Sequence, residues 1–324
     1  MKGRAESAMY GYGDIKLFAG SGSLDLAQEI SDYLSVPLSG YDLVEFPNEN
    51  LFIRLHGSVR GQDVYLIQSM PPPVHRNLME LLIMIDTLKR DSAGRITAVV
   101  PYMAYARSDK KDQPRVPITA RLVSDMIEVA GADRYITIDL HAGQIQGFFS
   151  IPGDVLTAFH LLSDYFLEKN LKEAVVATAD LGFAKKGRNF AAKLSTPLAF
   201  VEKRRRGDDP RAVATTLIGN VEGKDVIIVD DEVLTGGSVS EAVEIVVAHG
   251  ARDVYLSFTH GLLVPPARER LAAQPIKEIV TTNTVPVPTE KRLPNMTVLS
   301  VAPLLSEVIL RAHEGRSVGE LFNE

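Results

Sequence analysis

Two adjacent carboxylates and a glycine-rich turn stand together late in the chain, directly after the apolar run Val226–Val229. The acids are Asp230 and Asp231, and the turn consists of Thr235, Gly236, Gly237 and Ser238. If the turn opens a helix, its free amides and positive dipole form a natural site for a phosphate monoester. The glycines allow close approach of the backbone, and the acids can accept hydrogen bonds from sugar hydroxyls. The alternative is an ordinary strand-to-helix turn capped by a serine.

A run of four cations, from Lys203 to Arg206 and including Arg205, follows another apolar stretch, Leu198–Val201. Such a run usually lies in a solvated loop. Transfer of a phosphoryl or diphosphoryl group, however, needs positive charge around the oxygens as the transition state develops. Glycine and aspartate residues follow the run, and they suit a flap that closes over a substrate and excludes water.

Two further polar residues follow apolar runs typical of strands. His141 comes directly after the predicted strand Tyr135–Leu140, and Asp180 comes two residues after the predicted strand Ala174–Thr178. A lone histidine is more often a hydrogen-bonded polar residue than a metal ligand. Asp180 fits a helix N-cap about as well as it fits a site residue. The residues by themselves leave both questions open.

Short apolar strands that alternate with amphipathic helices predict an α/β fold with parallel sheets. The other expected strands are Ile15–Ala19, Val64–Ile67, Ile96–Pro101, Val226–Val229 and Val254–Phe258, with more near Ile279 and Val298. The expected helices are Leu24–Leu34, Leu78–Leu88, Ile118–Ala130, Val155–Glu168, Lys185–Leu194 and Val239–His249.

A faint internal repeat predicts two related domains. Arg60–Ile67 resembles Glu222–Val229, and Ala93–Ile96 resembles Gly250–Val254. A chance match between strands rich in valine and isoleucine is the alternative to a true duplication. The duplication predicts an extension over residues 1–14, a first domain over 15–152 and a second over 153–324, whose last helix could pack back on the first.

The two copies differ where the second carries its acids and glycines. In the first copy this position holds Ser69, Met70 and the prolines Pro71–Pro73. Proline has no amide hydrogen to donate to a phosphate. We therefore expect only the second domain to hold a phosphorylated sugar.

Composition narrows the function classes. The chain has 324 residues, 45% hydrophobic and 23% charged, which suits two globular domains. A net charge of -6 gives no broad field for nucleic acid or an anionic membrane. The absence of cysteine excludes disulfides and thiolate chemistry and suits a cytoplasmic protein. No apolar run reaches membrane-spanning length, the start does not read as a signal peptide, and no P-loop motif is present.

The segment that carries the acids and the turn resembles the phosphoribosyl-diphosphate loop of phosphoribosyltransferases and ribose-phosphate diphosphokinases. Other stretches resemble the diphosphokinases specifically: Asn77–Leu81, Ala93–Tyr102 with Tyr105–Arg107, Val116–Ala120 and Asp139–Phe149. The resemblance implies two tandem phosphoribosyltransferase-like domains, each a mainly parallel sheet flanked by helices. It also implies Mg²⁺-dependent transfer of diphosphate from ATP to the C1 hydroxyl of ribose 5-phosphate, giving 5-phosphoribosyl 1-diphosphate and AMP.

The same resemblance implies roles for particular residues. Lys203 and Arg205 match the family's catalytic Lys-Arg-Arg loop, His141 matches a ligand of Mg²⁺, and Asp180 matches an aspartate that approaches metal and sugar phosphate. The expected ribose 5-phosphate-binding residues are Asp230, Asp231, Thr235, Gly236, Gly237 and Ser238. The expected ATP-binding residues are Phe46, Asn48, Asn50, Arg107, Ser108 and Asp109.

Several positions depart from the family pattern. Asn48 and Asn50 replace two carboxylates, Ser108 replaces a glutamine, and Leu234 replaces an aspartate of the sugar-phosphate loop. An asparagine both donates and accepts hydrogen bonds, whereas a carboxylate only accepts, so the choice of purine base is expected to differ. An apolar side chain cannot bind a hydroxyl, so weaker binding of ribose 5-phosphate is expected.

The sequence leaves two alternative functions open for a protein with this fold. A phosphoribosyltransferase would share the sugar-phosphate loop, but the repeat and the segment around His141 argue against it. A non-catalytic regulatory homologue is favoured by Leu234 and the two asparagines, and it is opposed by Lys203 and Arg205. The resemblance further implies a homo-oligomer, commonly a hexamer built from dimers, with a nucleotide site shared between chains.

Overall fold

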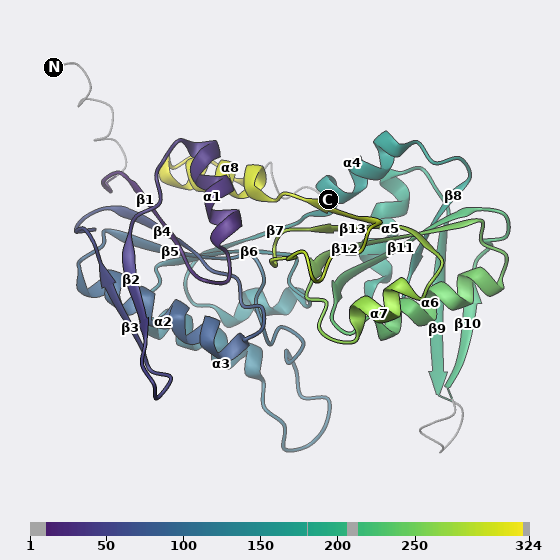
Figure 1. The fold of residues 1–324 in the computed structure, drawn as a ribbon, viewed down its shortest axis with the longest axis horizontal. Helices are drawn as coiled ribbons and strands as arrows, with labels where there is room; N and C mark the ends of the chain where they lie inside the picture. The colour runs from purple at the N-terminus through teal and green to yellow at the C-terminus, as the bar shows by residue number, and fades with distance from the viewer. Residues whose placement is uncertain (1–10, 180, 206–212, 320–324) are drawn as a thin grey trace. The chain divides into compact units, whose positions relative to one another are not determined.

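The computed structural model describes residues 11–179, 181–205 and 213–319. The chain forms two compact units, each with its own sheet (Figure 1). Unit 1 comprises Met1–Thr157, Thr284–Pro286 and Ser300–Asn323, and unit 2 comprises Ala158–Asn283 and Val287–Leu299. None of the helices in the described part of the chain is long and apolar enough to cross a membrane.

Unit 1 is built on a parallel sheet with the strand order β1-β4-β5-β6-β7. Its strands are β1 (Ile15–Ala19), β4 (Asp63–Ile67), β5 (Arg95–Val100), β6 (Arg134–Ile138) and β7 (Gly153–Leu156). Its helices are α1 (Leu24–Leu34), α2 (Val74–Arg90), α3 (Thr119–Ala130), the short 3₁₀ helix η2 (Gly143–Phe148) and α8 (Ala302–His313). Figure 1 shows α1 and α8 side by side on one face of the sheet, and α2 and α3 on the other. The inner strand β4 is buried along its whole length, as in sheets covered on both faces.

A separate hairpin extends from unit 1 and was not among the expected elements. It consists of β2 (Tyr41–Glu45) and β3 (Leu51–Leu55), which pair antiparallel, with Glu45 opposite Leu51. The turn between them, residues 46–50, is exposed. Glu49 in this turn has φ 65°, a left-handed conformation that glycine adopts most easily. The hairpin packs on α2, which places the turn beside that helix.

The helix expected at Val155–Glu168 begins later than predicted. Residues up to Leu156 form the edge strand β7, which pairs with β6, and the helix α4 starts at Phe159. The strand wins here because β6 offers backbone partners and because Gly153 lets the strand approach Tyr135, where a Cβ atom would meet the ring at 1.9 Å. Unit 1 therefore extends beyond position 152, to Thr157.

Unit 2 has a larger, mainly parallel sheet with the strand order β10-β9-β8-β11-β12-β13-β14 among its described residues. The strands are β8 (Ala174–Thr178), β9 (Leu198–Arg205), β10 (Val213–Ile218), β11 (Asp225–Val233), β12 (Asp253–Gly261), β13 (Ile276–Thr282) and β14 (Met296–Leu299). The helices are α4 (Phe159–Lys169), η3 (Leu181–Phe183), α5 (Ala184–Lys193), α6 (Gly237–Ala248) and α7 (Ala267–Ala272). The only antiparallel pair among these strands is β9 with β10.

The internal duplication inferred from the sequence is confirmed. The order β1-β4-β5-β6-β7 in unit 1 recurs in unit 2 as β8-β11-β12-β13-β14. The ion pair between Asp63 and Arg95 recurs between Asp225 and Arg252. The glycine two residues before each aspartate has nearly the same φ, 70° in unit 1 and 69° in unit 2.

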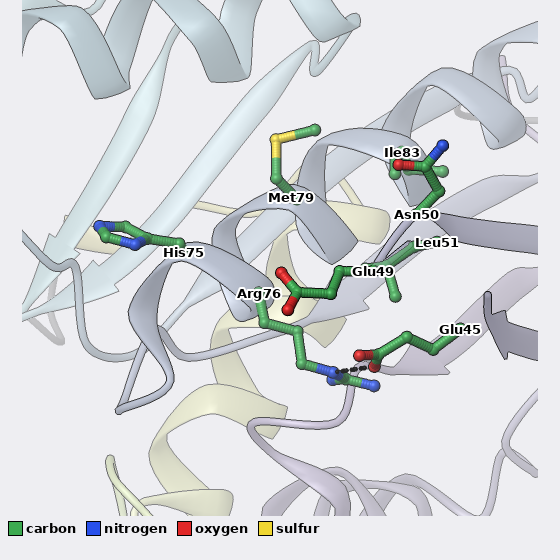
Figure 2. Close-up of a pocket in the computed structure, with 8 residues that line it drawn as sticks. All are labelled: Glu45, Glu49, Asn50, Leu51, His75, Arg76, Met79 and Ile83. Atoms are coloured by element: carbon green, nitrogen blue, oxygen red, sulfur yellow. Dashed lines mark hydrogen bonds and ion pairs between the residues drawn. The ribbon is translucent and has the colours of Figure 1, made fainter. Parts of the chain in front are cut away.

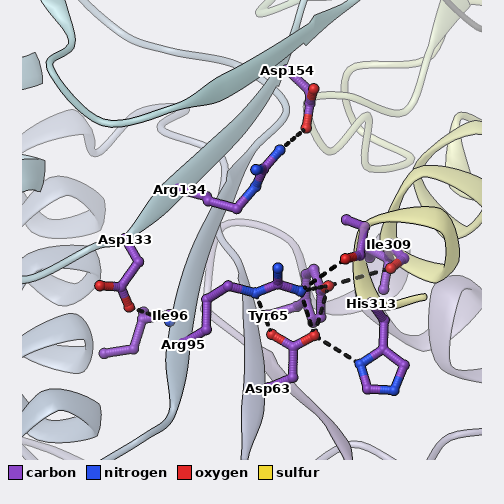
Figure 3. A network of polar contacts seen from close by, with 10 residues as sticks. Asp63, Tyr65, Arg95, Ile96, Asp133, Arg134, Asp154, Ile309 and His313 are labelled. Atoms are coloured by element: carbon purple, nitrogen blue, oxygen red, sulfur yellow. Dashed lines mark hydrogen bonds and ion pairs between the residues drawn. The ribbon is translucent and has the colours of Figure 1, made fainter. Parts of the chain in front are cut away.

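In unit 1, the repeated ion pair is part of a larger buried network of hydrogen bonds that connects α8 to the sheet (Figure 3). The carboxylate of Asp63 is fully buried and accepts hydrogen bonds from Arg95 Nε at 2.8 Å and Nη2 at 2.6 Å. Tyr65 donates to it at 3.0 Å, and Nδ1 of His313, on α8, lies 2.8 Å from it. Arg95 also donates to the carbonyl of Ala312 at 3.1 Å, so two strands and α8 share one charged centre.

The ionisation of Asp63 should make the stability of unit 1 sensitive to acid. Burial alone would raise the pKa of this carboxyl, but the hydrogen bonds from His313, Arg95 and Tyr65 and the charge of Arg95 hold it below its usual range. A depressed pKa contributes stability that is present above the unfolded-state value and is lost as the pH falls through the folded value. We expect this loss below about pH 4. Urea midpoints followed from about pH 6 to pH 3 should fall more steeply for the wild type than for Asp63→Asn, and parallel curves would contradict the assignment.

Candidate active site

The two acids of the glycine-rich segment lie inside strand β11, which runs four residues beyond its predicted end at Val229. Pairing with β8 stops at Val229, but pairing with β12 continues to Val233, and this explains the longer strand. Asp231 is buried, and its amide donates to Oδ1 of half-buried Asp230 at 2.9 Å. The acids are thus fixed in a strand and not carried on a mobile loop.

The turn after β11 presents the N-terminus of α6, as the sequence predicts. Gly236 is its N-cap residue with φ 74°, a conformation in which any other residue would be strained. A Cβ atom at Gly237 would come within 3.4 Å of Nη1 of Arg270, and that same nitrogen donates to the carbonyl of Thr235 at 3.2 Å. Together with exposed Ser238, these residues form a rigid turn of the kind that binds anions.

Leu234 sits in the same turn and is half-buried. Its carbonyl accepts a hydrogen bond from the amide of Val264 at 3.0 Å, and the carbonyl of Val233 accepts one from Leu263 at 3.1 Å. These bonds fix the backbone of the turn without using the side chain of Leu234. The side chain is therefore free to be exchanged for the aspartate that the sequence pattern would place here.

The cationic run continues strand β9 up to Arg205, so the loop expected after Val201 begins later than predicted. Lys203 pairs with Thr215, and Arg205 pairs with Val213, in the antiparallel ladder with β10. That pairing satisfies the backbone groups and holds the run extended. The side chains of both cations lie outside the described part of the structure, as does the whole of Asp180.

The expected nucleotide-binding residues of unit 1 form two groups, of which the first is the hairpin turn. Phe46, Asn48 and Asn50 are all exposed there. The turn is closed by hydrogen bonds from Phe46 N to Asn50 O at 2.9 Å and from Glu49 N to Phe46 O at 2.8 Å. Asn48 accepts from the amide of Asn50 at 3.3 Å, so this side chain also shapes the turn.

The second group is the segment after β5, where the structure adds links that the sequence analysis missed. Ser108 accepts a hydrogen bond from the amide of Thr119 at 3.1 Å and so satisfies the first amide of α3 from a separate segment. Asp109 is buried and accepts one from Gln144, which lies in η2. The segment that carries exposed Arg107 is thereby joined to the segment that carries exposed His141.

A hollow of about 430 Å³ lies between the hairpin and α2 in unit 1 (Figure 2). Its lining comprises Glu45, Glu49, Asn50 and Leu51 from the hairpin and His75, Arg76, Met79 and Ile83 from α2. Of the residues expected to bind the nucleotide, Asn50 is the one that lines it. The hairpin turn therefore borders a cavity and is not packed against other described side chains on that side.

Comparisons with known proteins now decide the family. Residues 15–131 match the model of the N-terminal domain of ribose phosphate pyrophosphokinase, and residues 209–323 match that of the phosphoribosyl synthetase-associated domain. The ribose-phosphate pyrophosphokinase of Caldanaerobacter subterraneus subsp. tengcongensis is 48% identical over 309 residues, which cover 95% of this chain and 98% of that one. The chain belongs to the ribose-phosphate pyrophosphokinase family.

Further similarities agree with this membership. The ribose-phosphate pyrophosphokinase of Bacillus subtilis is 43% identical over 320 residues, 98% of this chain and all of that one. The crystal structure of phosphoribosylpyrophosphate synthetase from Mycobacterium smegmatis matches with a TM-score of 0.90 and 42% identity, over 94% of this chain and 100% of that one. The predicted family, the predicted enzyme class and the predicted fold of two tandem, mainly parallel phosphoribosyltransferase-like domains are confirmed.

Membership of this family implies that a divalent cation takes part. The side chains described in this chain could supply one or two ligands to Mg²⁺ but not a complete coordination shell. Within residues 11–179, 181–205 and 213–319, no three histidine or acidic side chains are grouped so that they could hold a metal. Mg²⁺ usually keeps several waters and binds through one or two side chains plus substrate phosphates, so no protein cage is required. Exposed His141, three residues after the end of β6, fits a partner of that kind.

Proposed function

We propose that this chain transfers the diphosphate of ATP to the C1 hydroxyl of ribose 5-phosphate, giving 5-phosphoribosyl 1-diphosphate and AMP. The observation that carries the proposal is the arrangement of acids and turn between β11 and α6. The fixed carboxylates of Asp230 and Asp231 there stand six and five residues before Gly236, the glycine that caps the N-terminus of α6. This combination suits a sugar that carries both hydroxyls and a phosphate.

In this proposal unit 2 binds the sugar phosphate. Asp230 and Asp231 accept hydrogen bonds from ring hydroxyls, while the amides of Gly236 and Gly237 and the hydroxyls of Thr235 and Ser238 bind the 5-phosphate. Because β11 and the turn are held by backbone hydrogen bonds to the segments beside them, the sugar would be oriented with little reorganisation.

The transfer itself is a direct displacement. The C1 oxygen attacks the β-phosphorus, the bond between that phosphorus and the oxygen of the α-phosphate breaks, AMP leaves, and the hydroxyl proton is released. Lys203 and Arg205 stabilise the charge that develops on the phosphate oxygens. Bound Mg²⁺, with His141 and Asp180 as protein ligands, would supply further positive charge to the triphosphate. No residue is assigned as general base.

Unit 1 supplies the nucleotide-binding residues in the same proposal, namely the hairpin turn and the segment from Arg107 to Asp109. A homo-oligomer built from dimers, with the turn serving a neighbouring copy, belongs to it as well, as does a cytoplasmic location. In support, Val44, Phe46 and Phe52 expose apolar side chains on the hairpin, and the two phenyl rings lie 6.5 Å apart. Aromatic groups of this kind are enriched in protein interfaces.

The test is an assay of purified full-length protein with ribose 5-phosphate, Mg²⁺ and either ATP or GTP. Nucleoside monophosphate and phosphoribosyl diphosphate should appear in equal amounts. Comparable rates with the two donors would indicate that Asn48 and Asn50 relax the choice of base. A folded protein that binds ribose 5-phosphate but gives no product with either donor would overturn the proposal in favour of a regulatory homologue.

Leu234 offers a gain-of-function prediction. The Leu234→Asp variant should lower the KM for ribose 5-phosphate about fivefold, because a carboxylate at this place in the turn can accept a hydrogen bond from a sugar hydroxyl. The backbone of the turn should not move, since its bonds to Leu263 and Val264 do not involve the side chain. Steady-state kinetics should be compared with Ile218→Asp, which places the same acid at an exposed apolar position on β10. An equal change in both variants, or a higher KM in Leu234→Asp, would contradict the assignment.

A further inference from the structure

A buried carboxylate on α2 organises the part of unit 1 that surrounds the hairpin. The side chain of Glu80 is only 1% exposed. Its Oε1 accepts hydrogen bonds from the amide of Ser21 at 2.8 Å and from the hydroxyl of Ser21 at 2.9 Å. Tyr41, the first residue of β2, lies 3.4 Å from the same oxygen through its hydroxyl. Glu80 therefore ties the turn after β1 and the start of the hairpin to one helix.

The phenol of Tyr41 adds to this anchor because it stays protonated. Burial, followed by the negative charge of Glu80, raises the pKa of Tyr41 above its usual range. The hydroxyl donates to the carbonyl of Ala19 at 2.7 Å. The base of the hairpin is thus fixed to β1 as well as to α2.

Arg76 links the buried carboxylate of Glu80 to Glu45 at the other end of β2. Its Nη1 lies 3.1 Å from Oε2 of Glu80, one helical turn away. Its Nε lies 2.9 Å from Oε2 of Glu45, the contact drawn in Figure 2. Arg76 is 31% exposed and Glu45 is 45% exposed, so the bridge leads from the interior to the surface. A guanidinium can span two carboxylates in this way because it presents several donors in one plane.

Glu45 is the last residue of β2, directly before the turn that contains Phe46, Asn48 and Asn50. The turn lies over the hollow beside α2, and its residues are exposed. A loop with few packed neighbours has many accessible conformations, and a contact at its end removes part of that freedom.

We propose that Arg76, anchored by Glu80, is a positioning residue that holds the turn Phe46–Asn50 in one conformation through Glu45. This inference rests on the proposed function only in its consequence, which is that the preset turn meets the base of a nucleoside triphosphate without first having to be ordered. Arg76 itself would not touch the reacting atoms. The role therefore belongs to binding of the nucleotide and not to the transfer step.

The first experiment measures the turn directly in the full-length protein without nucleotide. Hydrogen exchange at the amides of Phe46, Glu49 and Asn50 should become about threefold faster in Glu45→Ala. A partly exposed ion pair stabilises the closed turn only modestly, and its loss should make local opening more frequent by about this factor. Glu45→Gln should stay close to the wild type, since its amide oxygen still accepts from Arg76. Asp86→Asn is the matched control, because it breaks an exposed ion pair with Arg90 on the same helix, 2.7 Å long, that has no link to the turn.

The second experiment measures the consequence for the enzyme. Glu45→Ala should raise the KM for the nucleotide about three- to fivefold, with kcat and the KM for ribose 5-phosphate unchanged. Glu45→Gln should restore most of the affinity, which a general loss of stability would not explain. Adding Glu45→Ala to Arg76→Gln should raise the nucleotide KM little beyond that of Arg76→Gln alone, because the bridge to Glu45 is already broken once Arg76 is replaced.

Each outcome decides a separate claim. Unchanged exchange at the turn in Glu45→Ala, or an equal change in Asp86→Asn, would overturn the positioning role whatever the kinetics show. Faster exchange with an unchanged nucleotide KM would overturn the link to nucleotide binding. A wild-type protein without activity would overturn the proposed function, while the exchange experiment would still support or overturn the role of Arg76.

Discussion

Replacing Lys203 with alanine is expected to lower kcat about a thousandfold, the range seen when one charge-stabilising donor is removed from a transition state. The KM for ribose 5-phosphate should change less than about twofold, since the proposed sugar-phosphate site lies in β11 and the turn after it. Fold should be preserved because the backbone of Lys203 pairs with Thr215 through groups that alanine retains.

This expectation can be checked by steady-state kinetics that follow both products, with Lys277→Ala as control. Lys277 is also a strand lysine of unit 2, but it is 54% exposed and paired with Asp253 at 2.6 Å. The control should keep full activity. If Lys203→Ala raised the KM for ribose 5-phosphate and left kcat intact, Lys203 would bind the ground state and would not stabilise the transition state.

The largest effect on stability is expected for Asp63→Asn, about 3 kcal/mol lost from the free energy of unfolding of unit 1. The amide keeps the shape of the side chain but removes the charge that balances Arg95, which is 12% exposed. A buried cation without its partner is strongly destabilising. The contact between Asp63 and His313 would weaken as well, so the hold on α8 should loosen.

The internal duplication provides the matched control, Asp225→Asn. Asp225 holds the equivalent position in unit 2, but its partner Arg252 is 43% exposed and can be hydrated when the charge is lost. We expect Asp225→Asn to lower the free energy of unfolding of unit 2 by about 1 kcal/mol or less. Urea unfolding monitored by hydrogen exchange separates the two units. Equal losses in the two variants would show that the network around α8 adds nothing to the simple ion pair.

Much of the fold follows from the sequence because buried parallel strands leave a strong pattern. β1, β8 and α1 begin and end at the predicted residues, and β4, β5 and β6 differ from the prediction by one or two positions. β9, β11 and β12 run three or four residues beyond their predicted ends. Continuous runs of valine, isoleucine and leucine specify such strands without knowledge of their neighbours. The glycines of the turn before α6 were equally informative, because positive φ at Gly236 demands that residue.

The elements that were missed depend on partners distant in sequence. β2 and β3 show a weak alternation around Phe46–Asn50, and β7 exists because β6 offers a free edge to Gly153–Leu156. The extension of β11 through Asp230 likewise depends on β12. Propensity within a short window cannot report such pairings.

The candidate site was foreseen in its residue types but not in its supports. Three contacts join segments that only the fold brings together: the hydrogen bond from the first amide of α3 to Ser108, the bond from Gln144 to Asp109, and the bridge through Arg76. Glu80 had a usable signal, since an acid among the apolar positions of a helix must find partners when it is buried. The asparagines of the hairpin turn remain a prediction about base selectivity.

The position of α8 in unit 1 has a consequence for biosynthesis. Unit 2 is complete once Leu299 has been made, whereas unit 1, most of which precedes unit 2 in the sequence, still lacks the helix that packs beside α1. Domains generally fold as units while the chain emerges from the ribosome, starting at the N-terminus. Of the two units, the one that appears first would be finished last. Until α8 has been made, its nascent form would expose the apolar surface that α8 covers and would lack the contact between His313 and Asp63.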